Sequence, residues 1–367
     1  MGGKIDLKPT DDRSHPEYRR DPLTGQIVII ARQRAHRPMS RFPSDDEDLP
    51  SGDCPFCEGR ETMTPPEVFA IRPEGGARDS VGWQVRVVPN KYPALMVGAG
   101  ETPSWSEHSG HLGDLLQDDA LPGVGHHEVV IECPDHASSY HRHGDAQAGA
   151  VFLAYRERLR CFARKEGIAS AIVFKNSGRS AGASQPHAHS QIIAMPLVPP
   201  ILEREWRGCD DYWRENGRHY FANLLDAERS HGERIVEATD DFVAWCPYAS
   251  RFPYELCVCP REEQARYDEA SDHQVEALGA LMRRLMLAMD NALGSVAFNY
   301  FLHTASLDSP NVDGVPAGFR WHLEITPRLE GLAGFEIGSG MYINPVPPDM
   351  AARDWRRYMP AADGATS

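Results

Sequence analysis

The sequence predicts an α+β fold built from two related units in tandem, because one order of patterns occurs twice. The first copy has two strand-like runs, a run with helical spacing and a further strand-like run, at residues 83–89, 127–136, 148–166 and 187–194. The second copy repeats this order at residues 242–248, 254–260, 272–293 and 321–327. We expect antiparallel sheets with flanking helices, in units 1–196 and 197–367 of one pseudo-symmetric protomer.

The elements of the first copy follow in order along the chain. Residues 40–52 and 98–125 are polar and rich in turn-forming residues, which predicts exposed loops. Between them, residues 83–88 alternate like a half-buried strand. Residues 148–166 have apolar side chains at helical spacing, and we expect most arginines of this helix to form a solvated face. Short strands then flank a turn, at residues 173–175 and 191–194.

Two histidines open the last of these strands. His187 and His189 stand two residues apart, directly before the apolar residues 192–194, so a strand would turn both side chains to one face. Imidazole can ligate zinc, and it can also carry a phosphoryl or nucleotidyl group. A pair of hydrogen-bonded structural histidines is the alternative.

A cysteine pair far upstream favours a metal. Cys54 and Cys57 have the spacing that lets two thiolates bind one tetrahedral ion. A closed zinc site needs four ligands, and His136 and His187 are the candidates for the missing two. A redox-active CxxC is the alternative, but no thioredoxin-like pattern surrounds the pair.

With these residues assembled, the chain resembles the galactose-1-phosphate uridylyltransferase family of the histidine triad superfamily. The resemblance covers nearly the whole length, and its landmarks occur in the family's order at residues 19–25, 34–38, 54–57, 88–95, 127–136, Asn176 and 187–191. It implies two histidine-triad-like units, the first catalytic and zinc-binding, the second ending in a sugar-binding segment. It also implies that His189 attacks the α-phosphorus of a nucleoside diphosphate sugar, forming a nucleotidyl-histidine that a second sugar phosphate resolves.

The resemblance also assigns the residues that surround the substrates. Gln191 and Ser184 join His189 as catalytic residues, since both match phosphoryl contacts of the family. Those expected to bind substrate are Arg34, Arg37, Asn90, Asn176, Phe335 and Glu336, the last two as an aromatic-acid pair on the sugar. The family commonly has proline between the two histidines, where this chain has Ala188, and this departure weakens assignment to the uridylyl branch.

A second metal site, for iron or zinc, is implied in the second unit. The matching positions are Glu205, His303, His322 and Glu324. An ordinary polar cluster is the alternative. We expect Glu324 to occupy the place equivalent to His189, which would leave the second unit without a nucleophile.

Composition restricts the partners. The formal net charge of -15 over 367 residues argues against nucleic acid and anionic membranes. No signal core or long apolar run is present, so we expect a cytoplasmic protein, and the resemblance implies a homodimer. The predicted activity is transfer of a nucleoside monophosphate, with UMP preferred, from a nucleoside diphosphate sugar to a sugar 1-phosphate in carbohydrate metabolism. A phosphorylase or adenylyltransferase using ADP-sugars, a nucleotide hydrolase and a zinc-stabilised nucleotide sensor are the alternatives.

Overall fold

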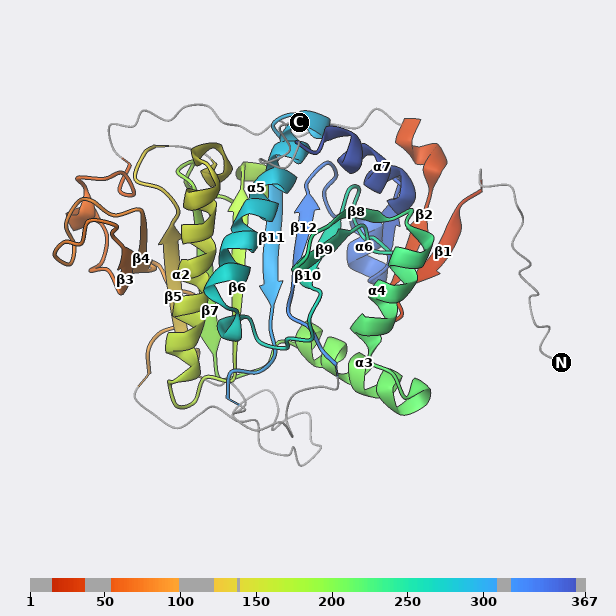
Figure 1. Cartoon of the computed structure of the whole chain (residues 1–367), viewed down its shortest axis with the longest axis horizontal. Helices are drawn as coiled ribbons and strands as arrows, with labels where there is room; N and C mark the ends of the chain where they lie inside the picture. The colour runs from red at the N-terminus through yellow and green to blue at the C-terminus, as the bar shows by residue number, and fades with distance from the viewer. Residues whose placement is uncertain (1–14, 37–53, 99–121, 137–138, 309–317, 361–367) are drawn as a thin grey trace.

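One ten-stranded sheet runs through both units of the chain (Figure 1). The structure, a computed structural model, describes residues 15–36, 54–98, 122–136, 139–308 and 318–360. The expected loop at residues 40–52 and most of the one at 98–125 lie outside these ranges. Every strand pair of the large sheet is antiparallel, which confirms the α+β prediction.

Each half of the sheet contributes five strands, and the halves meet at β6 and β11. From the outer edge inward, the first half consists of β3 (Phe69–Ile71), β4 (Val85–Pro89), β5 (His126–Ile131), β7 (His189–Met195) and β6 (Ser170–Ser177). From the centre outward, the second consists of β11 (Phe298–His303), β12 (His322–Pro327), β10 (Leu256–Pro260), β9 (Phe242–Trp245) and β8 (Ile235–Ala238). The internal duplication is therefore visible in the strand order.

The strand registers correct one expected equivalence. Phe174 of β6 pairs with Phe301 of β11, where the two halves meet. On the next strand outward in each half, Phe174 pairs with Gln191 of β7, and Phe301 pairs with Glu324 of β12. His189 and His322 are the first residues of β7 and β12. Glu324 therefore corresponds to Gln191, and the residue equivalent to His189 is His322.

Two long helices cover one face of the sheet. Helices α2 (Asp145–Ala163) and α5 (Asp272–Leu293) lie side by side across it (Figure 1) and enclose the main hydrophobic core. Ser271 begins α5 with a capping box, in which Ser271 and Gln274 exchange hydrogen bonds. The helices approach closely at a glycine pair, because a Cβ added to Gly279 would lie 2.5 Å from the backbone nitrogen of Gly149.

Two expectations about burial in the first unit are wrong. Arg156 and Arg158 of α2 are buried, not solvated; Arg158 forms two 2.7 Å hydrogen bonds with the buried Glu128 of β5. Strand β4 is buried on both faces rather than one. The reason is that Val85 and Val87 pack in the main core, while Trp83 and Val88 pack beneath the segment that carries Phe56.

The remaining elements surround the second half. They are helices α3 (Pro200–Asn216), α4 (Tyr220–His231), α6 (Gly334–Ser339) and α7 (Pro348–Tyr358), and a small sheet of β1 (Glu17–Arg20), β2 (Ile27–Ile30) and β13 (Tyr342–Asn344). Strand β2 pairs in parallel with β13, so the N-terminal segment lies against the second unit. The division at residue 196 stays a prediction. Among the described helices, none is long and apolar enough to cross a membrane.

Candidate active site and metal clusters

Four residues from three separate segments form a cluster suited to a metal, which we call the Cys54 cluster. Ligand atoms of Cys54, Cys57, His136 and His187 all lie within 4.8 Å of one another. The His187 Nδ1 atom is 3.5 Å from the Cys54 sulfur and 3.7 Å from the Cys57 sulfur, and His136 Nδ1 is 3.4 Å from the Cys57 sulfur. The structure thus brings together the four residues predicted as zinc ligands.

The tautomer of His187 fits this role. Its Nε2–H donates to the Cys133 carbonyl at 2.8 Å, so Nδ1 carries the lone pair and faces the thiols. Burial lowers the pKa of His187 to about 4 and, together with Cys54, raises the pKa of Cys57 to about 11. Two sulfur and two nitrogen donors are a set that zinc binds tetrahedrally, displacing the thiol protons.

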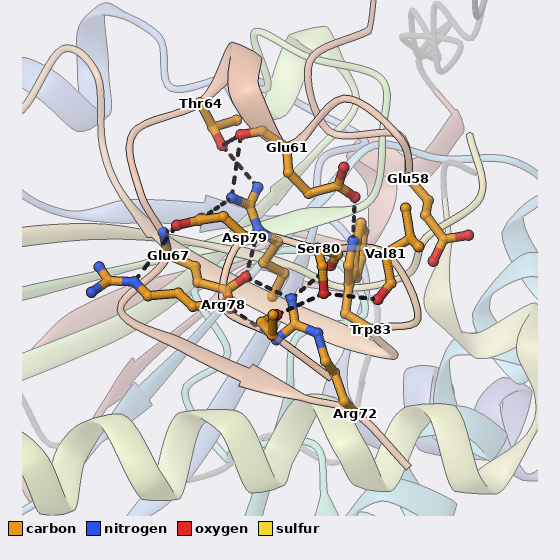
Figure 2. A network of polar contacts seen from close by, with 12 residues as sticks. Glu58, Glu61, Thr64, Glu67, Arg72, Arg78, Asp79, Ser80, Val81 and Trp83 are labelled. Atoms are coloured by element: carbon orange, nitrogen blue, oxygen red, sulfur yellow. Dashed lines mark hydrogen bonds and ion pairs between the residues drawn. The ribbon is translucent and has the colours of Figure 1, made fainter. Parts of the chain in front are cut away.

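A polar network holds the segment that carries the two cysteines against β4 (Figure 2). The buried Arg86 of β4 donates to Glu67 at 2.9 Å and to Asp79 at 2.7 Å, and Trp83 donates to Glu61 at 2.8 Å. Burial opposes ionisation of Glu67, but hydrogen bonds from arginines hold its pKa below the usual range. The segment that follows the CxxC pair is therefore held by hydrogen bonds to Glu58 and Glu61 and by ion pairs of Arg86, which sequence patterns did not reveal.

His189 lies on the sheet face opposite the two long helices. Its neighbour Ser190 turns to the helices and accepts a 2.7 Å hydrogen bond from Tyr155 of α2, so the alternation of the strand turns His189 the other way. The Nδ1–H of His189 donates to the His187 carbonyl at 2.8 Å, which leaves the lone pair on Nε2. Burial lowers the pKa of His189, so the ring is neutral and nucleophilic.

A buried ion pair contacts the backbone of His189. Lys175 of β6 donates to Glu132 at 2.5 Å and to the backbone carbonyl of His189 at 3.1 Å. Lys175 is 2% exposed and Glu132 is fully buried, so this pair lies within the core. Neither residue was predicted from the sequence, although a charged residue within an apolar run was a visible signal.

Gln191 lies two residues beyond His189 on the same face and has two polar neighbours. Its Oε1 atom is 2.7 Å from His127 Nε2 and 3.4 Å from Asn90 Nδ2. Asn90 was predicted to bind substrate, and the structure places it beside Gln191. His127 was not predicted, although it begins the run whose last residue, His136, was assigned to zinc.

The other predicted substrate residues are more dispersed. Asn176 accepts a 2.8 Å hydrogen bond from Asn299, and Ser184 is exposed in the segment before His187. Arg34 is exposed in a 3₁₀ helix, Arg32–His36, and Arg37 lies outside the described residues. Phe335 and Glu336 lie in α6 beside β13, where Glu336 accepts from the Ala333 amide. The described contacts do not join this pair to His189.

The predicted second cluster also assembles. Ligand atoms of Glu205, His303, His322 and Glu324 lie within 4.8 Å of one another, with His303 Nδ1 3.0 Å from Glu205. His322 repeats the geometry of His189, since its Nδ1–H donates to the Arg320 carbonyl at 2.9 Å. Its Nε2, however, faces Glu205 and Glu324, each at 3.8 Å.

Arg251 changes the balance of charge in this second cluster. It donates to Glu324 and, at 2.6 Å, to Glu255. Burial opposes ionisation of Glu324, but Arg251, His303 and His322 together hold the pKa of Glu324 below the usual range. Burial likewise opposes protonation of His303, but Glu205 and Glu324 together raise the pKa of His303. Both carboxylates thus have partners within the chain, Arg251 for Glu324 and His303 for Glu205, and metal binding here stays a prediction.

Comparison with known proteins places the chain among the histidine-triad-like nucleotidyltransferases. Within that class it belongs to the galactose-1-phosphate uridyl transferase family, whose N-terminal domain model matches residues 6–199 and whose C-terminal domain model matches residues 205–341. The family prediction is confirmed, and with it the fold class.

Curated relatives carry two different activities in their names. The chain is 34% identical to an ADP-glucose phosphorylase of Arabidopsis thaliana, over 94% of this chain and 93% of the relative. It is 27% identical to a galactose-1-phosphate uridylyltransferase of Thermotoga maritima, over 93% of this chain and 98% of the relative.

Solved structures agree with this placement. An Arabidopsis thaliana ADP-glucose phosphorylase with bound ADP-glucose superposes with a TM-score of 0.75 and 32% identity, over 93% of this chain and 99% of that one. A uridylyltransferase structure superposes with a TM-score of 0.69 at 23% identity, over 93% of this chain and 98% of that one, which shows the shared fold.

Proposed function

We propose that the protein transfers a nucleoside monophosphate from a nucleoside diphosphate sugar to a phosphate-bearing acceptor through a nucleotidyl-His189 intermediate. The observation that carries this proposal is the hydrogen bond from His189 Nδ1 to the His187 carbonyl. It fixes the tautomer of the neutral ring, with the lone pair on Nε2, and burial favours that neutral form. The strand that carries His189 is paired on both sides.

The reaction takes two displacements at phosphorus. His189 Nε2 attacks the α-phosphorus, an N–P bond forms, and the P–O bond to the β-phosphate breaks, so that the sugar 1-phosphate leaves. An oxygen of the acceptor phosphate then attacks the same phosphorus, and the N–P bond breaks. Histidine is restored with its lone pair, and the two half-reactions give ping-pong kinetics.

The remaining predicted residues have defined roles in this scheme. Gln191 and Asn90 supply amide donors to the phosphoryl oxygens, and Arg34 supplies positive charge for the diphosphate. Ser184, in the segment before β7, and Asn176, in β6, bind the phosphates, and Phe335 and Glu336 bind the sugar. The Cys54 cluster would hold zinc, whose role is to fix His187 and with it the start of β7.

UMP was the transferred group predicted from the sequence, whereas the likeness to known proteins favours AMP. The ADP-glucose phosphorylase is 34% identical to this chain, whereas the uridylyltransferase is 27% identical. Ala188, in place of the proline common in uridylyltransferases, supports the same choice. We therefore propose ADP-glucose as the first donor to test and inorganic phosphate as its acceptor, with uridylyl transfer to a sugar 1-phosphate as the second candidate.

Intact-protein mass spectrometry after brief exposure to ADP-glucose or UDP-glucose tests the proposal. The wild type is expected to gain one AMP with ADP-glucose, through an acid-labile bond to His189. Adding inorganic phosphate should remove the adduct and produce ADP. A UMP adduct removed by a sugar 1-phosphate would select the second candidate. An adduct on another residue, or none with either donor, would overturn the mechanism.

A further inference from the structure

His127 lies beside the nucleophile strand without a role in the mechanism so far. It belongs to β5, and its ring reaches Gln191 across the boundary between β5 and β7. The His127 Nε2 atom is 2.7 Å from Gln191 Oε1, and the His127 Nδ1 atom is 3.0 Å from the backbone nitrogen of Ala94. Both ring nitrogens therefore have partners.

The partner of Nδ1 fixes the tautomer of His127. A backbone N–H can only donate, so Nδ1 must accept from Ala94. A neutral imidazole that accepts at Nδ1 carries its hydrogen on Nε2, and that hydrogen points at Gln191. The group 2.7 Å away must then be the oxygen of the Gln191 amide rather than its nitrogen.

Asn90 converges on the same oxygen. The Tyr92 amide donates to Asn90 Oδ1 at 2.9 Å, which turns the Asn90 Nδ2 group toward Gln191 Oε1, 3.4 Å away. The same Nδ2 atom is 3.1 Å from His127 Nε2, and because Nε2 carries its hydrogen in this tautomer, that contact is an approach of two donors to one acceptor and not a hydrogen bond between them. Two donors, one short and one long, thus hold the carbonyl end of the Gln191 side chain. Its NH₂ end is left for another acceptor.

We propose that His127 is a positioning residue, which orients Gln191 so that its N–H groups face the phosphoryl group being transferred. The inference rests on the proposed function, in which Gln191 donates to the phosphoryl oxygens. The opposite orientation would place a carbonyl oxygen against those oxygens and replace attraction with repulsion. A correctly placed donor of this kind is worth roughly 10²- to 10³-fold in rate, so its orientation is a sizeable share of catalysis.

Two substitutions separate this role from a structural one, because each keeps a different half of the contacts. His127→Asn keeps an acceptor near the position of Nδ1, and so the link to Ala94, but cannot reach Gln191. His127→Gln keeps a donor near the position of Nε2, and so the bond to Gln191, but gives up Ala94. A residue that merely anchored the segment around Ala94 would tolerate asparagine and fail with glutamine.

The measurement is single-turnover formation of the nucleotidyl-enzyme, with thermal melting as a check on the fold. We expect His127→Asn to lower the limiting rate about tenfold, to change the half-saturating ADP-glucose concentration less than about twofold, and to leave the melting temperature near that of the wild type. His127→Gln should stay within about threefold of the wild-type rate. The reverse order of the two variants would overturn the proposal.

A double-mutant cycle decides the case in which both variants are slow. In a Gln191→Ala background there is no amide to orient, so His127→Asn should cause no further loss of rate. An additional loss of about tenfold in that background would contradict the proposal. Two different results distinguish failure of the proposed function from failure of the role of His127. If the wild type forms no adduct, the proposed function is wrong. If the wild type and His127→Asn react equally fast, only the role of His127 is wrong.

Discussion

The same face of the sheet is used in opposite ways in the two halves of the molecule. In the first half, His189, the proposed nucleophile, is followed on its face by Gln191, which one hydrogen bond joins to His127. In the second half, the equivalent His322 is followed by Glu324, which is joined to Glu255 through Arg251. The duplicated strands thus carry two electrostatic arrangements, one built from uncharged hydrogen-bonding groups and one built from ion pairs between side chains.

The elements that cover this face of the sheet also differ between the two halves. Helices α3 and α4 pack on this face in the second half, with Cys209 and Phe221 against Val243 and Cys257. In the first half, the described cover around Val88 and Val129 is the segment that carries Phe56. A duplicated unit therefore keeps its strands and its helical side, while the opposite side diverges. We expect this opposite side, rather than the shared fold, to decide which half does chemistry.

The largest expected effect separates the two equivalent histidines. His189→Asn should lower nucleotidyl transfer by at least about 10⁴-fold, because it removes the nucleophile while leaving zinc in place. His322→Asn, the matched change in the other half, should still form the adduct. Mass spectrometry and single-turnover rates measure both variants. An adduct of normal yield in His189→Asn would contradict the proposal that only the first half is reactive.

Metal analysis gives the next contrast. The wild type should hold about one zinc per chain at the Cys54 cluster, and a Cys54→Ser, Cys57→Ser variant should lose it, together with several kcal/mol of stability. Glu205→Gln, in the second cluster, should leave that zinc unchanged. His187→Asn should lower zinc content and reduce the rate only in part. Zinc retained in the double serine variant would remove the Cys54 cluster as the site.

The ion pairs of Arg251 allow a test of the second half. Arg251→Met leaves Glu255 and Glu324 without their cation and should lower the free energy of unfolding by about 3–5 kcal/mol. Combining it with Glu324→Gln should restore part of that loss, since one buried negative charge is then absent. Chemical denaturation measures each variant. A loss below about 0.5 kcal/mol would mean that solvent, rather than Arg251, neutralises this face.

The smallest expected effect lies at the helix crossing, where the halves also differ. A Cβ on Gly279 would lie 2.5 Å from a backbone nitrogen, whereas one on Gly149 would lie 3.8 Å from the Cα atom of Glu276. Gly279→Ala should therefore cost about 1–3 kcal/mol, and Gly149→Ala should be neutral or add up to about 1 kcal/mol through helix propensity. Thermal unfolding of the two alanine variants would show whether the crossing is as asymmetric as the contacts indicate.

Features carried by local spacing could be predicted from the sequence, and those set by strand register could not. The Cys54–Cys57 and His187–His189 pairs each lie within one short segment, so their chemistry could be predicted from the sequence alone. His127 acts on a residue 64 positions away, and Arg251 on one 73 positions away. Such partners are fixed by which strands pair and in what register.

The misplaced equivalence of Glu324 has the same origin. Sequence similarity aligned His322 with His187 and Glu324 with His189. The cross-strand pairs of the structure instead align Glu324 with Gln191, a difference of two residues. The buried arginines of α2 were missed because helical spacing marks only the apolar stripe. A charged residue beside that stripe is drawn into the interior when a carboxylate such as Glu128 is there to meet it.

The position of β7 inside the sheet sets a limit on how the protein can work. Both edges of the strand are hydrogen-bonded, to β5 and to β6, and Lys175 holds the carbonyl of His189 from below. His189 therefore cannot swing between two positions as a loop residue could. Under the proposed mechanism, donor and acceptor must come in turn to one stationary nitrogen, so the first sugar phosphate has to depart before the next phosphate can enter. The sheet itself would thereby impose the order of events.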